Sequence, residues 1–160
     1  MKRIQRTIAL ALCIAIAAPA FAGIGSGTAA YRGGTLPAKD GSEGRLELTD
    51  RTNAVYRTGK QRYEIPYTGV TSIEYGQKAG RRVGAAIATA VLVSPLGLAL
   101  LLSKKRKHMV TIAWTVDGKG ESAVFELGKD AIRPALAALE ARTGKQVEYE
   151  SEDARKNVGR

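Results

Sequence analysis

Few side chains in this chain of 160 residues are of the types that carry nucleophilic or metal chemistry. His108 is the single histidine, and Cys13 is the single cysteine. A serine or cysteine nucleophile needs a histidine base and a group that orients it, and a structural zinc site needs about four ligands drawn largely from cysteine and histidine. The sequence therefore predicts no nucleophilic triad, no metal site and no cofactor.

Paired carboxylates are the remaining route to acid–base catalysis. Glu47, Glu64 and Glu74 occupy the outward-facing positions of predicted strands, so they are expected on a solvated surface. His108 adjoins a basic cluster and is either a proton-linked switch or the first residue of a strand, of which the second is favoured. The sequence predicts a protein that is not an enzyme.

Short strands with alternating polarity account for most of the chain. Leu46 and Leu48 alternate with charged residues, and Thr58-Gly59-Lys60 reads as a hairpin turn. A proline at position 66 is expected to end a strand or keep it at a sheet edge. The predicted strands are 45–49, 55–57, 61–65, 70–75, 108–116 and 122–127. Tyr67, Tyr75 and Trp114 are read as core residues of this sheet, with interfacial anchoring as the alternative.

One amphipathic helix is predicted over residues 130–143. Ile132, Leu136 and Leu139 recur at helical spacing, and Gly144 supplies a C-terminal stop. Asp130 is expected to cap the helix, with a proline at position 134 in its first turn. Two segments are predicted to lack regular structure: a Gly- and Ala-rich lead-in, 23–43, and a charged tail, 148–160.

Residues 1–22 have the pattern of a secretory signal peptide. Three cations precede an apolar stretch, which ends in an Ala-Phe-Ala cleavage motif at 20–22. Cys13 lies inside this stretch and follows a bulky leucine, so lipidation is not expected. Removing the segment takes away three cations and no acid, so the net charge falls from +10 to +7. We expect export to the periplasm and association with the membrane there.

A run of twenty uncharged residues, Val83 to Leu102, interrupts the strand pattern, with basic residues on both sides. Such a run in a helix reaches about 30 Å, one bilayer core. Ser94-Pro95-Leu96-Gly97 at its centre breaks the helical pattern, which favours a hairpin of two short helices within an insertion at 83–103. A single transmembrane span, and burial against protein or against a second copy, stay open.

The hairpin interpretation assigns two sets of residues to a membrane. Basic residues are attracted to the head groups of anionic lipids. No aromatic residues lie among these basic ones, so a surface that stacks nucleic-acid bases is not expected. The expected anionic-lipid contacts are Arg81, Arg82, Lys104, Lys105, Arg106 and Lys107. The expected membrane-insertion residues are Val83, Ile87, Val91, Leu92, Val93, Pro95, Leu96, Leu98, Leu100, Leu101 and Leu102.

The order of these elements resembles the pleckstrin-homology-like (PH-like or GRAM-like) domains of bacteria. The resemblance rests on residues 44–49, on 65–75, on the hairpin around Asp117-Gly118 and on the helix 130–143, and covers about 44–147. It implies a mainly β (α+β) fold: an antiparallel barrel or curled sheet of six to seven strands with a C-terminal helix, here with an inserted apolar helical hairpin. Six strands are clear, so the seventh is absent or lies within 28–43.

Members of this family are binding modules for lipid or protein. The resemblance implies a non-enzymatic binding module. Together with the signal peptide, the apolar run and its basic flanks, it predicts a membrane-associated binding or adaptor module of the cell envelope, with anionic lipid as its partner. The alternatives are a single-pass or structural subunit of an envelope protein complex, or a homo-oligomer. An enzyme that acts on envelope lipid or glycan is the less favoured reading.

Overall fold

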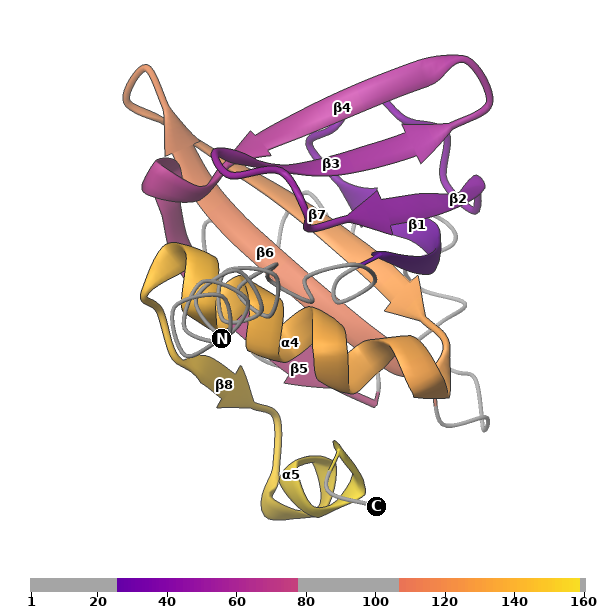
Figure 1. The fold of residues 1–160 in the computed structure, drawn as a ribbon, viewed down its shortest axis with the longest axis vertical. Helices are drawn as coiled ribbons and strands as arrows, with labels where there is room; N and C mark the ends of the chain where they lie inside the picture. Colours follow the sequence, from indigo (N-terminus) through magenta and orange to yellow (C-terminus); the bar gives the residue numbers. More distant parts are fainter. Residues whose placement is uncertain (1–25, 78–106, 159–160) are drawn as a thin grey trace, which may run out of the picture.

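The computed structural model describes residues 26–77 and 107–158. They form one eight-stranded sheet, two α-helices and a short 3-10 helix (Figure 1). The elements are β1 Ser26–Gly34, β2 Glu43–Glu47, β3 Asn53–Thr58, β4 Gln61–Pro66, η1 Tyr67–Gly69, β5 Val70–Gly76, β6 His108–Val116, β7 Lys119–Leu127, α4 Lys129–Thr143, β8 Val147–Tyr149 and α5 Glu152–Val158. The predicted signal peptide, and the predicted insertion at 83–103, lie outside the described residues.

The strand order is β4-β3-β2-β1-β7-β6-β5-β8. All neighbours are antiparallel except β5 and β8, which are parallel, so the sheet is mixed. The mainly β prediction is confirmed, whereas the expected six to seven antiparallel strands are too few. Both predicted hairpins are present, and Pro66 ends the edge strand β4 as expected.

The sheet curls around an aromatic core. Tyr31 in β1, Tyr56 in β3 and Phe125 in β7 form one cluster, and the rings of Tyr56 and Phe125 have centroids 5.0 Å apart. β2 and β1 separate β3 from β7 in the sheet, so this contact requires the sheet to fold over on itself. Helix α4 lies across the same side (Figure 1) and adds Ile132 and Leu139 to the core.

The Gly-rich segment 23–43, expected as a loose lead-in, contains strand β1, so that prediction is wrong for Ser26–Gly34. Its small residues hide the alternation, and only Ala29 and Tyr31 are buried in the core. Glycine here has a packing reason, because a Cβ on Gly27 would lie 2.5 Å from the Cβ of Ala131 in α4. The absence of a side chain in β1 lets the helix approach the strand closely.

The helix α4 is confirmed, but two details of its start are wrong. Gly128 is the N-cap, and Asp130 lies inside the first turn without a capping hydrogen bond. Because the helix starts at Lys129, Pro134 falls in the second turn instead of the first. Gly144 ends the helix with φ of 68°, as predicted.

The charged tail is also ordered, which corrects the boundary at residue 147. Val147–Tyr149 pairs with β5, and α5 follows. The hydroxyl of Ser151 accepts a hydrogen bond from the amide of Ala154 at 3.1 Å, and Glu152 and Asp153 occupy the first turn. Acidic residues at a helix N-terminus interact favourably with the helix dipole, and the serine caps a free amide. Both interactions stabilise a short helix in this charged stretch.

Candidate functional site

The chain leaves the sheet at the end of β5 and returns to it at the start of β6, and these two ends are adjacent. The backbone amide of Lys107 donates a hydrogen bond to the carbonyl of Gln77, with N and O 3.4 Å apart. The amide of Gln77 donates to the carboxylate of Glu150 at 3.0 Å. We call Tyr75, Gln77, Lys107, His108 and Glu150 the segment base, since residues 78–106 begin and end there.

Lys107 is the one predicted lipid-contact residue among the described residues, and its ammonium is in an ion pair. Its Nζ lies 2.9 Å from Oε2 of Glu126, which also accepts from Nε of Arg32 at 2.7 Å. All three side chains are 20–28% exposed. The charge of Lys107 therefore already has a protein partner, and the other predicted lipid contacts lie outside the described residues.

His108 begins β6 as expected and contacts Tyr75. The hydroxyl Oη of Tyr75 lies 2.7 Å from Nδ1 of His108, and their rings stack with centroids 6.0 Å apart. Burial raises the pKa of the Tyr75 hydroxyl, so this group stays protonated. Burial, and next the charge of Lys129, lower the pKa of the His108 imidazole, which favours the neutral ring, and its tautomer decides which of the two atoms donates.

This arrangement predicts a pH dependence of stability. The pKa of His108 in the folded protein lies below the unfolded value of about 6.5, so the unfolded chain takes up the proton first as the pH falls. The stabilising contribution is complete above pH 6.5 and is lost as the pH falls from there through the folded pKa. His108→Gln keeps a hydrogen-bonding side chain opposite Tyr75 and does not titrate. Urea unfolding at pH 7.5 and pH 5 should show a smaller loss of stability in the variant, and an equal or larger loss would contradict this assignment.

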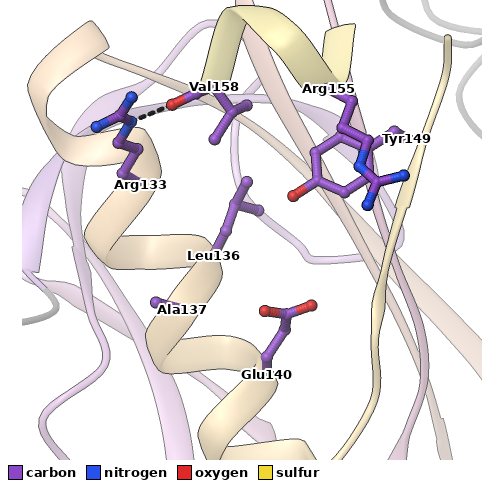
Figure 2. A pocket seen from close by; sticks show the side chains of 7 residues that line it. All are labelled: Arg133, Leu136, Ala137, Glu140, Tyr149, Arg155 and Val158. Atoms are coloured by element: carbon purple, nitrogen blue, oxygen red, sulfur yellow. Dashed lines mark hydrogen bonds between the residues drawn. The ribbon is translucent and has the colours of Figure 1, made fainter. Parts of the chain in front are cut away.

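A cavity of about 370 Å³ lies between α4, β8 and α5 (Figure 2). Tyr149, which lines it, makes an edge-to-face contact with Tyr75, with ring centroids 6.0 Å apart. The cavity therefore connects through one aromatic contact to the place where residues 78–106 begin. Its lining residues are Arg133, Leu136, Ala137, Glu140, Tyr149, Arg155 and Val158.

Two guanidinium groups and one carboxylate line this cavity above an apolar floor. Arg133 donates a hydrogen bond to the carbonyl of Val158, which ties α5 to α4 (Figure 2). Glu140 accepts from the amide of Val147 at 2.9 Å and so holds the start of β8. Arg155 makes no hydrogen bond or ion pair within 26–77 and 107–158 through its side chain, which leaves a cationic group for an anion.

The three predicted surface carboxylates do not come together. Glu47 pairs with Arg57 at 2.9 Å, and Glu64 pairs with Arg62 at 2.8 Å within its own strand. Glu74 lies on β5, on the far side of the sheet from these two strands in the strand order. The part of the chain that the structure describes holds no group of three His, Cys, Asp or Glu side chains placed for a metal ion.

The aromatic residues with two open interpretations are core residues. Tyr75 is fully buried, and Tyr67 and Trp114 are each 4% exposed. Burial raises the pKa of Tyr67 to about 12, so its hydroxyl remains neutral in the core. The interpretation as interfacial anchors is therefore wrong for all three.

Sequence reasoning missed the cavity because it treated β8 and α5 as a tail. Ser151 followed by two acids, and then by Arg155 and Lys156, is the signature of a short capped helix. That signal was present in the sequence. It identifies α5, and with it the second wall of the cavity.

Comparison with protein-family models gives no match, and comparison with curated proteins gives no significant match. Among the helices formed by residues 26–77 and 107–158, none has the length and hydropathy needed to cross a bilayer.

Proposed function

We propose that the protein is a non-enzymatic, membrane-associated binding module of PH-like fold, exported to the periplasm. Seven strands precede α4, as in PH-like domains. The seventh strand, predicted to be absent or within 28–43, corresponds to β1, and this supports the resemblance to the PH-like fold. The membrane-attaching part is the apolar run Val83–Leu102. The bound ligand is expected to be the head group of an anionic lipid.

The observation that carries this proposal is the pairing of β5 with β6 through six residue pairs. A single membrane span between them would put the two strands on opposite sides of the bilayer, and such strands cannot pair. The hydrogen bond between Gln77 and Lys107 instead brings both ends of residues 78–106 to one point. This supports a hairpin that enters and leaves on the same side over a single-pass span.

The charge pattern next to the segment base supports attraction to an anionic surface. Arg81 and Arg82 follow Gln77 by a few residues, and Lys104, Lys105 and Arg106 directly precede Lys107. Each basic residue close to an anionic membrane contributes about 1 kcal/mol. Arg155 in the neighbouring cavity adds a cation without a partner among the described residues.

Replacing Lys104, Lys105 and Arg106 by glutamine should weaken binding to vesicles that contain phosphatidylglycerol about tenfold to hundredfold. Flotation with vesicles at low and high salt measures the effect. The matched control replaces the exposed cations Lys39, Lys60 and Lys119, which lie in or next to connections between strands, and should leave binding nearly unchanged. Equal losses in the two triple variants would mean that net charge alone acts.

The single variant Lys107→Gln should lose less than one third of the effect of the triple variant, because its ammonium is already held by Glu126. An effect as large as that of the triple variant would place Lys107 at the lipid surface. If no variant binds vesicles and a stoichiometric partner co-purifies without lipid, the envelope-complex alternative is favoured.

A further inference from the structure

The middle of the sheet is buried on both of its faces. On β6, Val110, Ile112 and Trp114 point into the core, and the alternate residues point to the opposite side. That opposite side, which we call the outer face, is nevertheless inaccessible. It comprises Met109 (3% exposed), Thr111 (9%), Ala113 (2%), Ser122 (1%) and Val124 (1%).

The buried residues of the two helices do not lie on this face. The residues of α4 and α5 that are buried belong to the core cluster, on the other side of the sheet, and so do the aromatic residues of β1 and β3. Of the outer face, none belongs to that cluster. A sheet face without a covering layer is normally polar and wetted, whereas β6 reads as a continuous apolar strand of the kind that is covered twice.

The burial is confined to one end of the strands. Thr115 follows Ala113 on the same face of β6 and is exposed, as is its partner Gly120 on β7. The covered positions are those nearest to His108, where β6 leaves the segment base. The buried part of the outer face therefore lies at the end of the sheet at which residues 78–106 begin and end.

We propose that the outer face is the docking surface for the apolar run Val83–Leu102 of the same chain when no membrane is present. The length of chain outside the structure and the positions of its ends argue for this occupant. Twenty-nine residues join Gln77 to Lys107, and both of these lie one or two residues from the covered face.

Length and shape agree with this occupant. The covered stretch Met109–Ala113 is about 13 Å long at the rise of a strand. A helix over Val83–Val93, the half of the run that precedes Pro95, would be about 16 Å long. Gly84, Ala85 and Ala88 present little side chain, and Ala113 and Ser122 present little on the sheet, so close approach needs no rearrangement. The Ser122 hydroxyl has no partner among the described residues, as expected under an apolar layer.

The rate at which an introduced thiol reacts with a maleimide tests the proposal. In the full chain with Cys13→Ser, we expect Thr111→Cys to react at least about tenfold more slowly than the control Thr115→Cys, which lies on the same strand and face. Exchanging Val83–Leu102 for twenty Gly and Ser residues should bring the two rates within about threefold. Equal rates in the intact chain, or slow labelling that survives the exchange, would overturn the docking.

A disulfide test covers the case in which the exchanged chain does not fold. Thr111→Cys is combined in turn with Ala85→Cys, Ala88→Cys and Val91→Cys, and the dilute protein is oxidised. At least one pair should form an intramolecular disulfide, and none should form with Thr115→Cys. Failure of all three pairs, or a covalent dimer instead, contradicts docking within one chain.

The docking does not require the proposed membrane attachment, and the two can fail separately. A protein that protects the thiol at position 111 and does not float with vesicles has the docked run and no membrane role. A protein that floats with vesicles and leaves this thiol reactive in their absence attaches to membranes, and the run does not dock on its outer face.

Discussion

Replacing Phe125 by alanine is expected to lower the free energy of unfolding by about 3–5 kcal/mol. Phe125 is fully buried, and its ring contacts Tyr56 at 5.0 Å and Tyr31 at 6.0 Å between centroids. These three rings join the β1–β4 part of the sheet to the β7 strand across the curl. The substitution therefore removes apolar area and also leaves a cavity where the two parts meet. Urea unfolding monitored by the fluorescence of Trp114 measures the loss.

Phe125→Leu is the matched control. It keeps most of the volume and should cost less than about 1.5 kcal/mol. A larger loss of stability in the alanine variant than in the leucine variant shows that side-chain volume at position 125, and not aromaticity alone, stabilises the curled sheet. If the alanine variant loses less than the leucine variant, the aromatic cluster does not carry the core.

A second large loss is expected for Gly34→Ala at the end of β1. Gly34 has φ of +125°, in a region that is strained for any residue with a side chain. The added Cβ would also lie 2.3 Å from the carbonyl oxygen of Ser122 on β7. Strain and overpacking together should cost about 3 kcal/mol or more, because the neighbouring atom is backbone and cannot rotate away.

Gly120→Ala provides the comparison. Gly120 lies on β7, three residues before the partner of Gly34, and an added Cβ there meets nothing within 4 Å. Chemical denaturation should find this variant within about 0.5 kcal/mol of the parent. Equal losses at positions 34 and 120 would mean that any side chain in this region is harmful, which the geometry does not support.

The strands with alternating polarity were predictable, and so was the helix. β6 was predicted with its observed bounds, and the turn Asp117-Gly118 sets its pairing with β7. β1 could not be read because its inward residues are only Ala29 and Tyr31, and a bulge at Arg32 shifts the register. Its pairing with β2 and β7 is what defines it as a strand, and a single sequence carries no record of that pairing.

The candidate site divides in the same way. The residues predicted to contact lipid were chosen from their charge and their position next to the apolar run. For Lys107 this criterion is insufficient, because its ammonium pairs with Glu126. Its ion pair with Glu126 joins positions 19 apart, and the bond from Arg32 to the same carboxylate joins positions 94 apart. The cavity depends on Arg133 and Arg155, whose approach requires α5 to fold back onto α4. Contacts over such separations follow from the tertiary fold and from no local pattern.

The pairing of β1 with β7 sets the order in which this protein is expected to fold. β1–β4 follow one another along the chain, and β6–β7 form a hairpin with a two-residue turn, so both units can form from local contacts. Joining them closes a loop of about ninety residues, and β5 reaches β6 only after a further long connection. Sheets closed by such distant pairs fold in milliseconds to seconds, and their open strand edges favour aggregation in the interval. We therefore expect refolding yield to fall with protein concentration, and to recover when the two units are given time to meet in dilute solution.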